Sequence, residues 1–303
     1  MVVGLYGPTA SGKTDVAEAL ADRLCGELVS ADAMQAYGGL PILTNQSERV
    51  ARLVGIWPLE REASVAEFQE LAQAAVDEIL TAGRTPVVVG GTGLYLRAAL
   101  AALELPPRAP AAARSRLERL YDRLGPDRAH AVLADRDPAA AERVHANDRR
   151  RVVRALELAE LGSSLAPSSD MLWGGEYRHP TLVIGLDVPR DVLSARIEAR
   201  TSAMVERGVI AEARRALAGP VSQTALTIHG LRDFAELPLE EARETYNRRV
   251  RRYAAYQRKW MRRIPGVVII DANRPATEVA DEIVALARAR ERVPGDGAVR
   301  ADG

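Results

Sequence analysis

The octapeptide Gly7-Pro8-Thr9-Ala10-Ser11-Gly12-Lys13-Thr14 constrains the fold of this chain more than any other feature. It matches G-x-x-x-x-G-K-[ST], the P-loop pattern that binds phosphate groups. An apolar run at 2–6 precedes it, and residues 14–24 carry apolar side chains at helical spacing. A glycine-rich turn between a strand and a helix offers backbone amides and the helix dipole to an anion. The sequence therefore predicts strand, phosphate loop and helix in succession, and a phosphorylated substrate.

The choice of cation at this loop supports the same conclusion. The chain contains two lysines against thirty-nine arginines, and one of the two is Lys13. A compact ammonium and a planar guanidinium bind oxygen atoms with different geometry. We interpret the lysine as a requirement for an ammonium group at this position.

Composition limits the other possibilities. The 303 residues are 47% hydrophobic with a formal net charge of zero, so any nucleic acid must be bound by local basic patches. The single cysteine, Cys25, excludes an internal disulfide, fits a reducing cytoplasm and is expected to be a small core residue of the first helix. No apolar run approaches transmembrane length, and the strand expected at Val2 leaves no room for a cleaved leader. We expect a cytoplasmic protein with no membrane partner.

The distribution of apolar residues predicts an α/β fold. Apolar, β-branched runs recur at 2–6, 28–31, 87–89, 182–186 and 267–270, with helical periodicity between them. Continuous apolar runs of this kind are typical of parallel strands that are buried on both faces. A capping box, Ser64-Val65-Ala66-Glu67, opens a helix that extends to about Ala82. We predict a doubly wound, P-loop NTPase-like parallel sheet.

One interval lacks strand signals and predicts an all-helical insertion domain. Helices are expected from Pro110 to Leu124, after Asp137-Pro138, and from Asn147-Asp148 to about Leu161, followed by a loop at 163–170. We therefore divide the chain into a core with C-terminal helices, a helical insert and a tail expected to be disordered. The ranges are 1–105 and 180–292 for the core, 106–179 for the insert, and 293–303 for the tail.

Two further strand ends carry candidate chemistry. Asp32 follows the second strand, at the usual ligand crevice of an open α/β sheet. It is suited to bind magnesium, to act as a general base, or only to cap the next turn. The third strand ends in Gly90-Gly91-Thr92-Gly93, where the glycines permit close backbone approach and Thr92 offers a hydroxyl. The alternative is a tight turn without a chemical role.

Several blocks together resemble the tRNA dimethylallyltransferases over nearly the whole chain. They are GPTASGKT, SADAMQAY, ASVAEFQ, VVVGGTGLYLRAAL, VHANDRRRVVRALEL, RIEARTSAMVERG and, more loosely, YQRKWMRR. The resemblance implies a P-loop-kinase-like core with a helical insert, which agrees with the layout above. It also implies transfer of dimethylallyl from dimethylallyl diphosphate to the exocyclic amine of the adenosine 3′ to the anticodon.

The resemblance also implies roles for single residues. Asp32 corresponds to the catalytic aspartate and general base of the family, and Thr92 to a threonine that contacts the target adenosine. The P-loop would hold a diphosphate rather than ATP, with Thr14 also a ligand of Mg²⁺. The residues implied at the diphosphate are Gly7, Thr9, Ala10, Ser11, Gly12, Lys13, Thr14 and Arg200. Those implied at the anticodon stem-loop of tRNA are Asp32, Ala33, Met34, Gln35, Thr92, Arg114, Arg150, Arg151 and Arg154. A monomer is expected.

Two basic segments suit an RNA partner. Arg149, Arg150, Arg151 and Arg154 form a dense cluster that is offset only by Asp148. Residues 248–263 contain eight basic and no acidic side chains, with Tyr253, Tyr256 and Trp260 between them. The aromatic rings are suited to stack on bases, but their i, i+3, i+7 spacing favours a buried helix face.

Arg196 is equally compatible with an exposed helix face and with the diphosphate site.

The chain also departs from the family pattern and leaves other functions open. Ala33, Gly38 and Asn45-Gln46 replace a hydroxyl residue and two basic residues near the expected RNA path. Asn45-Gln46 resembles relatives that prenylate free adenine nucleotides, whereas the Asn-Asp-Arg-Arg-Arg block favours tRNA. A small-molecule P-loop kinase is a further alternative. A guanine-nucleotide switch is disfavoured because the chain has no Asn-Lys-x-Asp signature.

Overall fold

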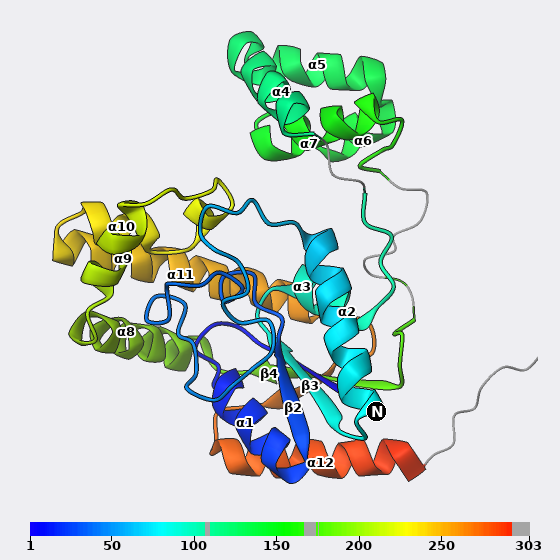
Figure 1. Ribbon diagram of the computed structural model, residues 1–303, viewed down its shortest axis with the longest axis vertical. Coiled ribbons are helices and arrows are strands. Elements are labelled where there is room, and N and C mark those ends of the chain that lie inside the picture. The colour runs from blue at the N-terminus through cyan, green and yellow to red at the C-terminus, as the bar shows by residue number, and fades with distance from the viewer. Residues whose placement is uncertain (107–109, 167–173, 175, 293–303) are drawn as a thin grey trace, which may run out of the picture. The chain divides into compact units, whose positions relative to one another are not determined.

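Five parallel strands form the centre of the core (Figure 1). The computed structural model describes residues 1–106, 110–166, 174 and 176–292. The strands, in the spatial order β2-β3-β1-β4-β5, are β1 (Val2–Tyr6), β2 (Gly26–Ser30), β3 (Thr85–Gly90), β4 (Thr181–Asp187) and β5 (Val268–Asp271). Each neighbouring pair is parallel. The predicted α/β fold with a parallel sheet is confirmed, and the predicted strands differ from the observed ones only at their ends.

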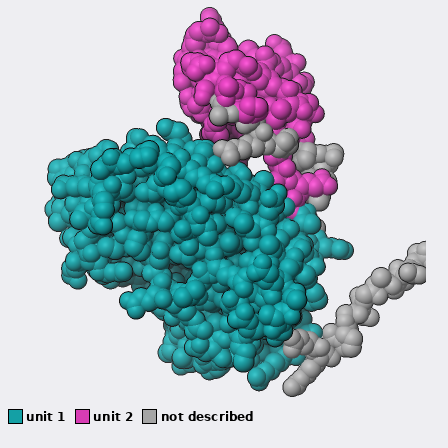
Figure 2. Space-filling view, viewed as in Figure 1, with its two compact units in different colours: residues 1–102, 175–303 teal, residues 103–174 magenta. Residues whose placement is uncertain are grey.

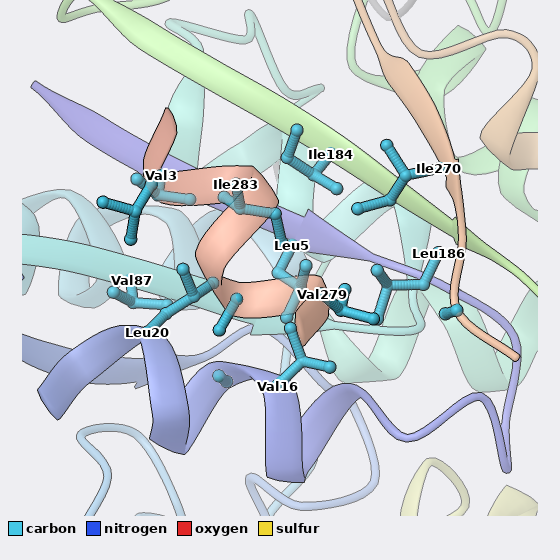
Figure 3. Packing of buried hydrophobic residues seen from close by; sticks show 14 of the residues in the cluster. Val3, Leu5, Val16, Leu20, Val87, Ile184, Leu186, Ile270, Val279 and Ile283 are labelled. Atoms are coloured by element: carbon cyan, nitrogen blue, oxygen red, sulfur yellow. The ribbon is translucent and has the colours of Figure 1, made fainter. Parts of the chain in front are cut away.

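Helices cover both faces of this sheet. On one face α1 (Lys13–Arg23) packs against α12 (Ala276–Arg292), and Val3 and Leu5 of β1 point into the core between them (Figure 3). On the other face α2 (Val65–Thr81) packs against α3 (Gly93–Leu100). Gly4 faces this second pair, since a Cβ atom there would lie 2.8 Å from Leu100. The carboxyl ends of β1, β2 and β3 therefore bring three loops to one edge of the sheet.

The predicted capping of α2 is present. The Ser64 hydroxyl accepts a hydrogen bond from the Glu67 N–H at 3.2 Å. The first helix, in contrast, does not contain Cys25. This residue is exposed, has φ 48°, and lies in the turn between α1 and β2. The prediction of a core cysteine is wrong because α1 ends at Arg23, before the apolar periodicity of the sequence does.

The segment between β4 and β5 forms a helical layer. Its helices are α8 (Arg190–Glu206), α9 (Val209–Leu217), the 3-10 turn Ala225–Thr227, α10 (Leu231–Glu236) and α11 (Leu239–Met261). The α11 helix packs on α8, α10 and α3. Its buried face consists of Ala242, Tyr246, Val250, Ala254, Gln257 and Met261. The expected buried stripe is wrong for Tyr256, which is 53% exposed, whereas Tyr253 and Trp260 are partly buried and the polar Gln257 is buried.

The chain divides into two compact units, residues 1–102 with 175–303, and residues 103–174 (Figure 2). The sequence placed the insert at 106–179. Residues just before β4 belong with the core because Ala101 and Tyr177 form an antiparallel bridge. Beside it, the Arg178 N–H donates to the Leu100 carbonyl at 2.9 Å. We refer to residues 103–174 as the insert unit and to the remainder as the core unit.

The insert unit is built from α4 (Ala111–Leu124), α5 (Pro126–Arg136), α6 (Pro138–Arg143) and α7 (Arg149–Glu160). Its apolar core includes Leu117, Leu133 and Leu156. The two predicted caps are present: Asp137 accepts from the Ala140 N–H at 3.0 Å and Asp148 from the Arg151 N–H at 3.1 Å. Residues 167–170 of the predicted loop and the predicted disordered tail at 293–303 lie outside the described residues. Of the helices described, none combines the length and hydropathy of a membrane span.

Candidate active site

The P-loop connects β1 to α1 in a conformation that requires glycine at two positions. Gly12 caps α1 with φ 83°, in the left-handed region, and Ala10 also adopts a positive φ of 64°. A Cβ atom on Gly7 would lie 2.7 Å from Ser11 Oγ, so only glycine lets the loop fold this closely. Ser11 Oγ is buried and has no hydrogen-bond partner among the described residues. The loop thus retains a donor that is suited to an anion.

Lys13 stands at the first residue of α1 and faces the same loop. Its Nζ donates a hydrogen bond to the Pro8 carbonyl at 2.7 Å. Burial, with a smaller contribution from the nearby Arg200, lowers the pKa of Lys13 to about 8, although the charge of Asp32 acts in the opposite direction. Binding of an anion beside Lys13 would therefore stabilise its ammonium group.

Asp32 and Thr92 lie at the ends of neighbouring strands and are connected through the backbone. Asp32 Oδ1 accepts a hydrogen bond from the Met34 N–H at 2.9 Å, which fixes the carboxylate. Thr92 Oγ1 lies 3.4 Å from the Ala33 N–H and 3.4 Å from the Tyr253 hydroxyl. Thr92 is the N-cap residue of α3, but its hydroxyl makes no capping hydrogen bond. The hydroxyl instead lies near Ala33 and Tyr253.

The core unit contains a cleft of about 370 Å³. The P-loop from Thr9 to Thr14 and Asp32 line it, and so does Tyr253, whose hydroxyl lies 3.4 Å from Thr92 Oγ1. Three arginines also line it: Arg196 and Arg200, one turn apart on α8, and Arg274, which follows β5. Arg200 Nη2 contacts the Tyr246 hydroxyl at 3.3 Å, and its buried Nε has no partner within the described part of the chain. Arg196 lines the cleft and also donates a hydrogen bond to Asn273 Oδ1 at 3.4 Å.

Comparison with known proteins agrees with this geometry. Residues 35–264 match the family model described as IPP transferase. The chain belongs to the IPP transferase family.

Similar members of this family extend over almost the full length of the chain. A tRNA dimethylallyltransferase of Salinispora arenicola is 40% identical over 284 residues, 89% of this chain and 82% of the relative. One from Kineococcus radiotolerans is 39% identical, with 97% and 96% covered. The solved tRNA isopentenylpyrophosphate transferase of Bacillus halodurans has 34% identity and a TM-score of 0.68, with 96% and 98% covered. A eukaryotic dimethylallyltransferase structure shares the fold at 24% identity and a TM-score of 0.79. The resemblance to tRNA dimethylallyltransferases is confirmed, and the kinase and free-nucleotide alternatives are not favoured.

The IPP transferase cleft also has an apolar side. Met34, Leu43, Val250 and Tyr253 are among the residues that line it. The loop that carries Leu43 is held from two directions. The Glu212 carboxylate accepts from the Ile42 and Leu43 N–H groups at 2.9 and 2.8 Å.

Gln35 holds the same loop from the other side. Its Nε2 donates to the Thr44 and Asn45 carbonyls at 3.2 Å each, and its Oε1 accepts from the Ser30 hydroxyl at 2.9 Å. The Gln35 carboxamide is therefore engaged inside the protein, although the sequence suggested an RNA contact. Asn45 of this loop has a positive φ of 51°.

The cleft offers oxygen atoms that are suited to a metal ion. The Thr14 hydroxyl and the Asp32 carboxylate line the same cleft, and such hard ligands suit Mg²⁺. No group of three or more His, Cys, Asp or Glu residues with metal-site geometry occurs in the described ranges. These residues fit a cation that takes most of its ligands from a bound diphosphate and water.

The basic cluster on α7 is more neutralised than the sequence suggested. The cluster appeared to be offset only by Asp148, but Asp122 of α4 accepts two hydrogen bonds at 2.8 Å from Arg149. Asp148 lies 3.7 Å from Arg151. Within the described residues no carboxylate lies at salt-bridge distance from Arg150. The acidic partners come from a helix some thirty positions away, so local charge counting missed them.

Two other predicted RNA-contacting arginines share one buried carboxylate. Glu157 is 2% exposed; its Oε2 lies 3.0 Å from Arg154, and its Oε1 lies 4.0 Å from Arg114. Arg154 also donates to the Pro106 carbonyl at 3.2 Å. Glu157 therefore holds side chains of α4 and α7 at one patch of the insert unit.

The second basic segment, at 248–263, is also partly paired. Arg249 binds Asp233 at 2.9 Å, Arg258 binds Asp187 at 2.8 Å, and Arg251 pairs with Glu198. These arginines fix α11 to α10, β4 and α8. Gln257, Tyr253 and Arg274 also line the cleft, which no local sequence pattern indicates, because only the packing of α11 and the path after β5 bring them to the site.

Proposed function

We propose that this chain transfers the dimethylallyl group of dimethylallyl diphosphate to the N6 amine of the adenosine 3′ to the anticodon. The acceptors are tRNAs that read U-starting codons, and the product is N6-(dimethylallyl)adenosine. One observation carries the proposal: a single cleft contains a P-loop, a strand-end aspartate and three arginines. Membership of the IPP transferase family supports it.

The donor would bind with its diphosphate at the P-loop. The loop residues from Gly7 to Thr14 supply amides and hydroxyls, while Lys13 and Arg200 supply charge. Arg196 and Arg274 are additional candidates because they line the same cleft. These cations would stabilise the negative charge that develops on the leaving group. The apolar side formed by Met34, Leu43 and Val250 suits the hydrocarbon part of the donor.

The acceptor chemistry falls to Asp32. The lone pair of the adenine N6 attacks C1 of the dimethylallyl group, the C1–O bond breaks, and diphosphate leaves with the bonding electrons. Asp32 accepts the N6 proton, as a general base positioned by the Met34 N–H. Thr92, whose hydroxyl lies 3.4 Å from the Ala33 N–H, would orient the adenine beside Ala33 and Met34. Since the target base is normally stacked, it must be splayed out to reach this cleft.

A divalent cation completes the donor site in this proposal. Mg²⁺ bound by the diphosphate and by Thr14 would supply additional positive charge to the leaving group. Arg114, Arg150, Arg151 and Arg154 on the insert unit, together with Gln35 of the core unit, are the proposed contacts to the anticodon stem-loop. We expect a monomer that acts on tRNA in the cytoplasm.

Transfer of labelled dimethylallyl from its diphosphate tests the proposal. The reaction is run with Mg²⁺ on unmodified tRNA and, in parallel, on AMP and ATP. Label in tRNA is the expected result, at the adenosine 3′ to the anticodon. Label in the nucleotides alone would overturn the acceptor assignment and implicate Asn45-Gln46. No label anywhere from folded protein would overturn the proposal.

A further inference from the structure

The buried carboxamide of Gln257 connects the P-loop to the turn that carries Thr92. Gln257 is 2% exposed and lies on the core-facing side of α11. Its Oε1 accepts a hydrogen bond from the Thr9 N–H of the P-loop at 2.8 Å. Its Nε2 donates to the Gly91 carbonyl at 2.8 Å, directly before Thr92. One side chain thus bonds to the donor loop and to the turn that carries Thr92.

The neighbouring glycines fit this connection closely. A Cβ atom on Gly91 would lie 2.3 Å from Gln257 Nε2, and one on Gly93 would lie 2.1 Å from the Trp260 ring. The close approach that the glycines of the Gly-Gly-Thr-Gly turn permit is therefore made by side chains of α11. Any other residue at Gly91 would displace the carboxamide and so break both bonds.

The Thr9 bond also has a consequence for the P-loop. Because its N–H is bonded to Gln257, Thr9 can reach a phosphate only through its hydroxyl. The Ser11 N–H is bonded to the Pro8 carbonyl at 3.2 Å, so the loop is held both by its own backbone and by α11. The P-loop and the Thr92 turn cannot move independently while both bonds are intact.

We infer that Gln257 is a positioning residue that aligns the diphosphate loop with the Thr92 turn, so that donor and acceptor meet in the correct geometry. This inference rests on the proposed function for the identity of the two ligands. A carboxamide is required because one site needs an acceptor and the other a donor. Glutamate at this position keeps the first bond and loses the second, whereas methionine fills the space and loses both.

Gln73 provides a matched control. Its Nε2 also makes two hydrogen bonds to backbone carbonyls, those of Ala98 and Ala101 at 3.1 Å each. These bonds join α2 to the far end of α3 and touch neither loop of the cleft. Gln73→Met should therefore reproduce the general cost of losing a carboxamide that bonds to two backbone groups, without an effect on alignment.

Hydrogen exchange with and without inorganic pyrophosphate tests the inference in the full chain. In the wild type, pyrophosphate should slow exchange in the segment 7–14 and also in the segment 90–93. In Gln257→Met only the P-loop segment should respond, while Gln73→Met should behave as the wild type does. Joint protection of both segments in Gln257→Met, or absence of a response at 90–93 in the wild type, would overturn the inference.

Prenyl transfer by the same proteins supplies a second readout. We expect kcat to fall about 10²-fold in Gln257→Met, the loss typical of misplaced reacting groups, with a much smaller change in KM for the donor. Gln257→Glu should share the loss in kcat because the Gly91 bond is absent in both variants. An equal kcat for Gln257→Met and Gln73→Met would reduce Gln257 to a packing role. If the wild type transfers no label, the proposed function fails, while the exchange measurement still decides the coupling.

Discussion

The cleft of the core unit and the surface of the insert unit formed by the α7 arginines both present positive charge. The two regions differ in what these cations contact. In the cleft, Lys13 and Arg200 contact a carbonyl and a hydroxyl, and one buried nitrogen of Arg200 has no partner among the described residues. On the insert unit, Arg149, Arg151 and Arg154 each lie close to a carboxylate. The cleft thus keeps desolvated charge for one small anion, whereas the insert surface keeps solvated charge that is largely neutralised. Substitutions should consequently have large, specific effects in the cleft and small, salt-dependent effects on the insert.

The largest effect is expected at Asp32. Asp32→Asn keeps the size of the side chain but removes the base, so kcat for prenyl transfer should fall about 10²- to 10⁴-fold. Inorganic pyrophosphate should still bind with nearly the wild-type Kd, because the P-loop is unchanged. Single-turnover transfer combined with calorimetry separates the two quantities. Wild-type turnover in this variant would remove Asp32 from the mechanism.

Lys13→Arg should have the next largest effect. The guanidinium conserves charge but is bulkier than the ammonium that fits against the Pro8 carbonyl at 2.7 Å. We expect the Kd for pyrophosphate to rise at least about tenfold, equivalent to about 1.4 kcal/mol. Thermal unfolding without ligand checks that the fold is retained. An unchanged Kd would mean that the cleft recognises charge as loosely as the insert surface does.

The pH dependence of pyrophosphate binding sharpens the same contrast. Because burial lowers the pKa of Lys13 to about 8, the free protein loses this charge as pH rises through that value. Affinity should be nearly constant below pH 7 and should fall by up to about tenfold per pH unit above pH 8. Lys13→Arg, whose guanidinium stays protonated, reports the ionisation of the ligand alone. Parallel curves for the two proteins from pH 7 to 9.5 would contradict the prediction.

The smallest effects are expected on the insert surface, where two adjacent arginines form a matched pair. Arg149 is bound by Asp122 through two hydrogen bonds of 2.8 Å, whereas Arg150 has no carboxylate partner among the described residues. Arg150→Gln should therefore lower tRNA affinity more than Arg149→Gln does. It should also reduce the slope of log Kd against log salt concentration by about 1. Filter binding at several salt concentrations measures both, and an equal loss in the two variants would show that local pairing does not matter.

Features that depend on residues close together in the chain could be predicted from the sequence. The strands, the P-loop and the caps at Ser64, Asp137 and Asp148 were predictable because each depends on residues adjacent in the chain. The positions of Asp32 and Thr92 at one edge followed from the geometry of parallel strands.

What could not be predicted depends on contacts between distant helices. The Tyr253, Tyr256 and Trp260 stripe was expected in the core, yet Tyr256 is exposed and the polar Gln257 is buried, because two loop backbones offer it hydrogen bonds. Periodicity indicates which residues share a helix face but not what that face meets. Likewise, the pairing of Arg149 with Asp122 depends on the packing of α7 against α4.

The bridge between Ala101 and Tyr177 has an evolutionary and practical consequence. In an antiparallel bridge the paired Cα atoms lie about 5 Å apart, so the chain leaves and re-enters the core unit at almost the same point. A segment attached in this way can be lengthened, exchanged or removed at a small cost in loop-closure entropy, because a turn of a few residues would join its two ends. The insert unit is therefore a replaceable module, and a hairpin in its place should leave a protein that still folds and still binds pyrophosphate.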